Sequence, residues 1–311
     1  MSQLLNVFAV VASIFMGLSI GASSVAPAFG PVNSSGSTNV LRAALLAGIF
    51  ALIGSVAQGA NVTGTVGSGL LSGSLGLGQG AVILAVASAL VIVSVIYDYP
   101  MPTAFTVVGA VLGSAFAFSN SINFPVVQKI FLYWLVVPFV SLALSYVLAK
   151  ILRRYLPEEG SEKKIKYLLL FSGSYMAYTA GAGSVGLAVG PLTSLDISSV
   201  ALLWLGGISI LVGAWMYSPR IIRAVSFDYS NIGPRRSIAA LLSASVLAQI
   251  GIFYGVPISF NEAIIASVIG SGLVEGKTNN DPKKIGYTVA AWASAFVLSG
   301  VITFVVCSLF F

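Results

Sequence analysis

Ten apolar runs follow one another along the chain, separated by short segments rich in glycine, proline, serine or charge. They fall near residues 3–22, 41–59, 79–97, 103–119 and 125–152, and then near 165–182, 199–218, 237–254, 258–274 and 286–310. Most approach the ~20 residues that a helix needs to cross a bilayer, whereas strands of a membrane barrel alternate over about 10 residues. The pattern predicts an all-α integral membrane protein with about ten transmembrane helices.

Composition supports this class. Hydrophobic residues make up 57% of the 311 positions, charged residues make up 8%, and the mean hydropathy is +0.99. A soluble domain carries about 25% charged residues. The first apolar run leads directly into a small polar motif, so we interpret it as the first span and not as a cleavable signal peptide.

The chain divides into two halves of five runs each. A first repeat over residues 1–152 and a second over 165–311 flank a charged linker at 153–164. Because five is odd, a duplicated half inserts the second time in the opposite orientation, which is the inverted repeat of secondary transporters. The segments GASSVAPAFGP (21–31) and GAGSVGLAVGP (181–191) are identical at seven of eleven positions, and Pro100 and Gly113 match Pro257 and Gly270.

Basic residues predict the orientation. With both termini outside, the cytoplasmic segments are 23–40, 98–102, 153–164, 219–236 and 275–285, and fourteen of the fifteen Lys and Arg residues lie in or beside them. The exception is Lys129. Under the positive-inside rule we expect a multi-pass cell-membrane protein with a cytoplasmic linker. The uncharged glycine-rich segment 60–78 is assigned outside, and the stretch from Gly64 to Gly80 is expected to be a flexible external connection.

The two repeated segments predict a binding site near the membrane midplane. Glycine and proline are expected to break both helices, which is tolerated at that depth only where the backbone is buried in protein or lines a water-filled cavity. Freed N–H groups at a helix start attract anions. The alternative is that the small residues merely allow close helix packing. The candidate substrate ligands are hydroxyl, amide and backbone groups of Ser23, Ser24, Val25, Thr103, Gly183, Ser184, Val185, Ser259 and Asn261.

Several functional classes are disfavoured. The chain has no histidine and one cysteine, Cys307, so we expect no metal site and no disulfide. No motif pairs two carboxylates, and the glycine-rich segment lacks the Lys-Ser/Thr ending of a phosphate-binding loop. We therefore expect no enzyme activity, no cofactor and no nucleic-acid partner. An anion channel stays open as an alternative, because channels also use helix ends and hydroxyls.

The repeated segments resemble the two signature motifs of the inorganic phosphate transporter (PiT) family, whose pattern is roughly G-x-N-D-x-A-N-x-x-G in each half. The stretch at 59–63 and the segments after Pro100 and Pro257 also resemble parts of this family. The resemblance covers most of the chain and implies inverted repeats with broken or re-entrant helices, the re-entrant candidates being 100–118 and 257–273. In the family, the motif Asn and Asp residues are associated with sodium and phosphate.

This chain departs from that pattern. The Asn-Asp pair is replaced by Ser23-Ser24 and by Gly183-Ser184, so neither motif aspartate is present. The second motif asparagine is Pro27 in the first half and Leu187 in the second. The first motif is most similar to the sulfate-permease branch of the family. The loss of both acids puts sodium coupling in doubt.

Chemistry favours sulfate or thiosulfate as the substrate. Phosphate carries a proton at neutral pH and benefits from a carboxylate acceptor, whereas sulfate only accepts hydrogen bonds and is repelled by a carboxylate. A site of hydroxyls, amides and helix ends suits sulfate. A sodium-coupled phosphate symporter remains the alternative.

Two acids are candidate coupling residues, because a concentrating anion importer needs cations. Asp98 sits two residues before Pro100, where it also suits a turn at the membrane boundary. Glu262 lies five residues past Pro257 within an apolar run, and an intramembrane acid is a functional hypothesis by default. We expect Glu262 to carry a proton, or else to pair with Gln249 or Asn261 and stabilise the segment. The expected partners are therefore an oxyanion, a proton or a sodium ion, and membrane lipid. The sequence also allows a homodimer.

Overall fold

The computed structural model describes residues 2–34, 38–73, 75–97, 101–224, 233–275 and 282–310. Each of the ten apolar runs falls on one helix. These helices are α1 (Ser2–Ile20), α3 (Val40–Gln58), α5 (Leu77–Ile96), α6 (Thr103–Ala117), α7 (Phe124–Tyr155), α8 (Glu162–Val189), α9 (Ser199–Ala224), α10 (Pro234–Phe253), α11 (Phe260–Gly272) and α12 (Pro282–Phe310). Short helical segments join them: η1 (Gly21–Val25), η2 (Ala26–Phe29), α2 (Gly30–Ser34), α4 (Ala60–Gly64), η3 (Thr65–Gly69), η4 (Gly190–Leu192) and η6 (Leu273–Glu275).

The protein is an all-helical, multi-pass membrane protein. Within the described ranges, seven segments are long and apolar enough to cross a bilayer: Gln3–Val25, Val40–Gln58, Leu77–Ile96, Phe124–Tyr155, Ser199–Met216, Pro234–Phe253 and Ala290–Phe310. Large apolar side chains are exposed along α1, α3, α7, α9 and α12, among them Phe8, Ile53, Phe139, Trp204 and Val301. A lipid environment explains this exposure, because a soluble protein rarely shows continuous apolar surface.

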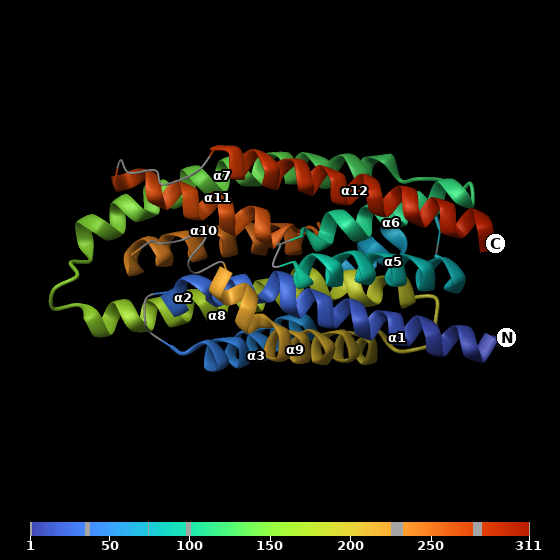
Figure 1. The fold of residues 1–311 in the computed structure, drawn as a ribbon, viewed down its shortest axis with the longest axis horizontal. Helices are drawn as coiled ribbons and strands as arrows, with labels where there is room; N and C mark the ends of the chain where they lie inside the picture. Colours follow the sequence, from blue (N-terminus) through green and yellow to red (C-terminus); the bar gives the residue numbers. More distant parts are fainter. Residues whose placement is uncertain are drawn as a thin grey trace.

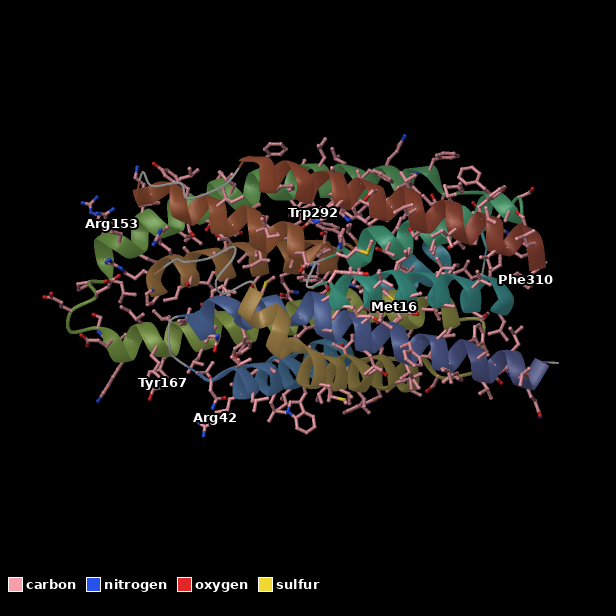
Figure 2. The ribbon with its side chains drawn as sticks, viewed as in Figure 1. Met16, Arg42, Arg153, Tyr167, Trp292 and Phe310 are labelled. Carbon is pink, nitrogen blue, oxygen red and sulfur yellow. The ribbon has the colours of Figure 1, made fainter. Side chains whose placement is uncertain are left out.

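The long helices run along the molecule's longest axis. Both termini lie at one end, and the linker between α7 and α8 lies at the opposite end (Figure 1). Arg42 and Arg153 lie toward the linker end, Phe310 lies at the other end, and the buried Met16 lies among the helices (Figure 2). In the described part of the chain, the ends of the first and last helices therefore lie opposite the linker.

Glycines bring two pairs of helices into close contact. A Cβ on Gly54 of α3 would collide with the Tyr178 carbonyl oxygen of α8, and one on Gly213 of α9 would collide with the Leu18 carbonyl oxygen of α1. Helices approach this closely only where no side chain intervenes. The contacts join α3 to α8 and α1 to α9, so helices from before and after the linker interleave.

Two helical hairpins face one another within this frame. The α5–α6 hairpin lies nearer the termini, and the α10–α11 hairpin lies nearer the linker (Figure 1). At 15 and 13 residues, α6 and α11 are too short to cross a bilayer alone. The side-chain N–H of Asn261, beside the second hairpin tip, donates to the Met101 carbonyl of the first at 3.1 Å. The two hairpin tips therefore meet inside the molecule.

This arrangement corrects the predicted cytoplasmic segment 98–102 at residues 101–102, since 98–100 lie outside the described residues. Within it, Met101 is half-buried and Pro102 is buried, and Met101 bonds to Asn261 in the interior. Two nearby prolines in the sequence predict an interruption between helices, but an interruption inside a membrane protein looks the same in sequence as one at its surface. Val256 and Pro257, at the other tip, are likewise buried.

The stretch from Gly64 to Gly80, predicted to be a flexible connection, also differs from expectation in its first part. Residues 60–69 form α4 and η3, and Val62, Thr63, Val66 and Gly67 are buried. Gly67 packs against the Gly190 backbone and Thr193. Glycine allows the η3 backbone to approach the Gly190 backbone closely here. This part of the segment is therefore packed against the rest of the protein and is not a flexible connection.

Candidate functional site

The first repeated segment has irregular backbone. After Ile20 the α-helix becomes the π-helical turn η1 and then the 3-10 turn η2. Proline at position 27 cannot donate a backbone hydrogen bond, which explains why a regular α-helix does not continue there. The π turn carries Ser23, Ser24 and Val25, all buried. Single π turns within helices occur frequently at functional sites.

The second repeated segment is regular, which contradicts the prediction that it breaks its helix. The α8 helix runs unbroken from Glu162 to Val189, and the irregular turn begins only at Gly190. Leu187 replaces the proline of the first segment, so every residue before Pro191 keeps its backbone donor. The glycines alone cost about 1 kcal/mol each relative to alanine, which helix packing can offset. Gly183, Ser184 and Val185 are buried on this continuous helix.

Hydroxyl groups join the first segment to the first hairpin. The Ser24 hydroxyl lies 3.0 Å from the Thr103 hydroxyl at the start of α6. The Ser23 hydroxyl lies 3.4 Å from that of Ser24 and donates to the Ser19 carbonyl at 2.8 Å. All three are almost fully buried. The structure thus brings these predicted ligands together.

The second segment adjoins the second hairpin. A Cβ on Gly183 would lie 2.8 Å from the Cζ atom of Phe260, the first residue of α11. The Ser259 hydroxyl caps this helix by accepting from the Glu262 backbone N–H at 3.4 Å. The two halves of the cluster are neighbours, because η1 contacts both α8 and α11, and α6 contacts α8.

Three polar atoms of this cluster are buried without a hydrogen-bond partner in the described structure. They are the Ser184 hydroxyl, the Asn261 carbonyl oxygen Oδ1 and the Glu262 oxygen Oε2. A buried polar group without a partner costs about 1–3 kcal/mol. Among the described residues, Glu262 is the one charged side chain that is buried, at 6% exposure. The three unpartnered atoms can form hydrogen bonds to a polar ligand, and the Glu262 carboxylate can also take up a proton.

One aromatic residue outside the predicted set contacts both hairpins. Trp134 of α7 was not identified from the sequence; its indole N–H donates to the Pro257 carbonyl at 2.8 Å, and its ring centroid lies 4.0 Å from that of Phe105. Trp134 therefore contacts both hairpins, and no local sequence pattern predicts this role.

The candidate coupling residue Asp98 lies outside the described residues. No group of three or more acids, histidines or cysteines suited to a metal ion occurs in the part that the structure describes.

An all-helical membrane frame around a buried polar cluster is the architecture of a membrane transporter. The solved structure of a sodium-dependent phosphate transporter has the same fold, with a TM-score of 0.87, 18% identity, and coverage of 99% of this chain and 100% of that chain. The family model described as "Phosphate transporter family" matches residues 20–303, and the chain belongs to that family.

Two curated relatives extend along nearly the whole chain. Sulfate permease CysP of Bacillus subtilis (strain 168) is 27% identical, over 97% of this chain and 87% of its own length. Putative phosphate permease MJ0630 of Methanocaldococcus jannaschii is 26% identical, over 95% of each chain. The family makes the chain an anion permease; which anion it carries is a matter for proposal.

Proposed function

We propose that this chain is a secondary transporter that imports a divalent tetrahedral oxyanion, sulfate or thiosulfate, by alternating access. The observation that carries the proposal is the cluster of buried hydroxyl and amide groups from both repeated segments and both hairpin tips, part of it unpaired. In this proposal the anion is held by side chains of Ser23, Ser24, Thr103, Ser184, Ser259 and Asn261 and by backbone N–H groups near Val25. The predicted backbone ligands Gly183 and Val185 lie within the unbroken α8 helix, so their N–H groups are engaged in regular helical hydrogen bonds and are not part of the proposed site.

The chemistry of the cluster supports sulfate. Hydroxyl and amide groups donate hydrogen bonds, which is what a fully deprotonated oxyanion accepts. The two repeated segments contribute no carboxylate, so a dianion near Ser24 meets no like charge there. The similarity to a sulfate permease over nearly the whole chain agrees with this chemistry.

Alternating access would use two inverted repeats, residues 1–152 and 165–311, joined by the linker 153–164. Equivalent glycine contacts support the duplication. Gly21 packs on Ile210 and Gly181 packs on Ala51; Gly48 packs on Leu211 and Gly207 packs on Leu52. Within each of these two sets, every residue lies 159 or 160 positions from its counterpart. Each of these contacts joins a residue before the linker to a residue after it, and the two contacts of a set exchange when the two halves are exchanged, which is the pattern expected of a duplicated half.

Proton coupling through Glu262 completes the proposal. Moving a dianion into a negative interior is uphill by roughly 2.3 kcal/mol per charge per 100 mV, so concentrative uptake needs cations. Burying an ionised carboxylate away from water is energetically costly. Glu262 is buried next to Asn261 in the first turn of α11. A proton taken up from outside would neutralise the carboxylate, let the anion bind, and leave on the inside.

Sodium-coupled phosphate symport is the second candidate. It is favoured by the similarity to a putative phosphate permease over 95% of both chains. The two candidates differ in what Ser24→Asp does, since restoring an acid at that motif position would help protonated phosphate and repel sulfate.

Labelled-anion binding to purified Ser24 variants tests the proposal. Losing one hydrogen bond to a charged group costs roughly 1.5–3 kcal/mol, so Ser24→Ala should weaken sulfate binding about tenfold to a hundredfold. Ser24→Asp should weaken sulfate binding further. Ser172→Ala is the control, because that buried hydroxyl already bonds to the Leu168 carbonyl of its own helix at 2.6 Å. Equal sulfate binding by the unmodified protein and Ser24→Asp would refute this placement.

A further inference from the structure

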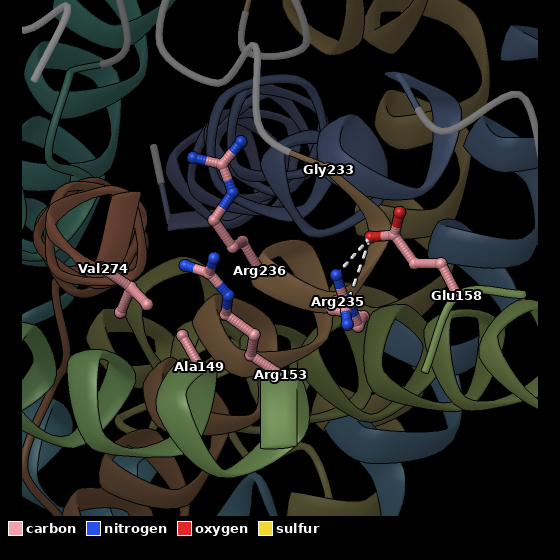
Figure 3. A pocket seen from close by; sticks show the side chains of 7 residues that line it. All are labelled: Ala149, Arg153, Glu158, Gly233, Arg235, Arg236 and Val274. Carbon is pink, nitrogen blue, oxygen red and sulfur yellow. Dashed lines mark hydrogen bonds and ion pairs between the residues drawn. The ribbon is translucent and has the colours of Figure 1, made fainter. Parts of the chain in front are cut away.

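A second polar site lies far from the hairpin tips, at the end of the molecule that carries the linker. Ala149, Arg153, Glu158, Gly233, Arg235, Arg236 and Val274 line a pocket there, with about 320 Å³ of empty space that includes its opening to solvent. The lining comes from the end of α7, the linker, the start of α10 and η6. Residues before and after the linker therefore meet around one hollow (Figure 3).

The charge of the lining is strongly positive. Three of the seven lining residues are arginines, and Glu158 is the one acid among them. Arg235 engages that acid: its Nη2 and Nε atoms lie 2.9 Å from the Glu158 Oε1 atom, and its Nη1 atom donates to the Leu156 carbonyl at 3.1 Å. The Arg153 and Arg236 side chains extend toward the same space (Figure 3). The lining residues themselves carry three positive charges and one negative charge.

The start of α10 adds to this field. The helix is 20 residues long, its N-cap is Gly233, and no side chain caps its first N–H groups. An uncapped helix N-terminus carries partial positive charge and open donors. The donors lie beside the Arg235 and Arg236 side chains, so one ligand can meet both kinds of group.

We propose that this pocket binds a doubly charged tetrahedral oxyanion of the phosphate or sulfate type, at a site separate from the transport site. Guanidinium groups pair with such oxyanions through two parallel hydrogen bonds, which gives geometry as well as charge. The ligand is either the free anion or the phosphate of an anionic lipid headgroup. A bound anion would tie α7 and the linker to α10 and η6, and so restrain the linker end of the transporter.

Hydrogen–deuterium exchange of the full chain tests this site locally. The purified protein is placed in nanodiscs of neutral phosphatidylcholine, and inorganic phosphate or sulfate is titrated in. The first N–H groups of a helix lack intrahelical acceptors and exchange readily, so a bound anion should slow exchange in peptides covering 153–158 and 233–238. In a second arm, nanodiscs containing phosphatidic acid receive no free anion. The same protection there identifies the lipid headgroup as the source.

Matched variants distinguish the pocket from general surface charge. Arg153→Ala should shift the midpoint of protection about tenfold to a hundredfold to higher concentration, and Arg153→Lys should lie in between. Arg154→Ala removes the same charge from the same helical turn, but the Arg154 guanidinium lies 5.4 Å from the centre of the Tyr155 ring and does not line the pocket. It should behave like the unmodified protein.

Two results would overturn the inference. One is the absence of protection at 153–158 and 233–238 in both arms. The other is an equal midpoint in Arg153→Ala, Arg154→Ala and the unmodified protein. Peptides covering 181–185 and 259–262 report the proposed transport site separately. If the proposed transport function is wrong, the result at this pocket can therefore still be interpreted.

Discussion

Serine hydroxyls supply most of the buried hydrogen-bonding groups of the candidate site. Ser24 pairs with Thr103, while the Ser184 hydroxyl has no partner within the described structure. A serine hydroxyl can rotate to donate to an incoming oxyanion, whereas an ionised carboxylate can only accept. We therefore expect a hydroxyl in place of the acid in both repeated segments to favour sulfate over phosphate.

In the proposed mechanism, proton coupling depends on Glu262. Glutamine keeps the size and removes the titratable group, so Glu262→Gln should retain anion exchange but lose uptake driven by an inward proton gradient. Uptake and counterflow of labelled sulfate in liposomes measure the two activities. Glu159→Gln, on the exposed linker, is the control. If Glu262→Gln still concentrates sulfate on an imposed pH gradient as well as the unmodified protein does, Glu262 is not the coupling site.

At the scale of helices, the two repeated segments show how one proline changes local structure. Both segments contain the same glycines at their ends, yet the first becomes π and 3-10 helix while the second stays α-helical through Val189. Proline at position 27 lacks a backbone donor, and Leu187 at the matching position keeps one. The irregular backbone therefore lies on one side of the cluster, in η1 and η2. Backbone N–H groups in these turns depart from the regular α-helical hydrogen-bond pattern, so they are better candidates for binding a ligand than those of α8.

Glycine contacts hold the interleaved helices together. Gly54→Ala should force α3 away from the Tyr178 carbonyl of α8 and cost about 1–3 kcal/mol of stability. The measurement is the thermal unfolding midpoint of purified protein in one detergent. Gly64→Ala is the matched control, because a Cβ there would meet nothing within 4 Å; it should leave the midpoint unchanged or slightly raised. An equal midpoint for the two variants would contradict the close-packing account.

At the scale of the whole molecule, the order of the helices was predictable and the path between them was less so. Ten apolar runs predict ten helices, and each run is helical in the structure. The depth of the hairpin tips was not predictable, because Met101 and Asn261 meet across 160 positions through a backbone carbonyl. Of the cluster, Ser24 and Thr103 were each predicted from the sequence as candidate ligands, but the contact between their hydroxyls is visible only in the structure. Trp134 was not predicted, because its role depends on tertiary contact with Pro257.

The distribution of basic residues predicts the orientation of the protein in the membrane. We expect the linker to be cytoplasmic and both termini to be outside. In a Cys307→Ser background, which removes the one native cysteine, Glu159→Cys should resist a membrane-impermeant maleimide in intact cells, while Ser194→Cys should react. Both positions are exposed. Labelling of Glu159→Cys from outside would reverse the topology.

Anion selectivity in liposomes tests the central proposal most directly. The purified chain is reconstituted, and uptake of labelled sulfate and labelled phosphate is compared with an inward proton gradient, an inward sodium gradient or neither. We predict saturable sulfate uptake that thiosulfate inhibits, that an inward proton gradient drives and that does not require sodium. Phosphate uptake that requires sodium, with no uptake of sulfate under any gradient, would contradict the account.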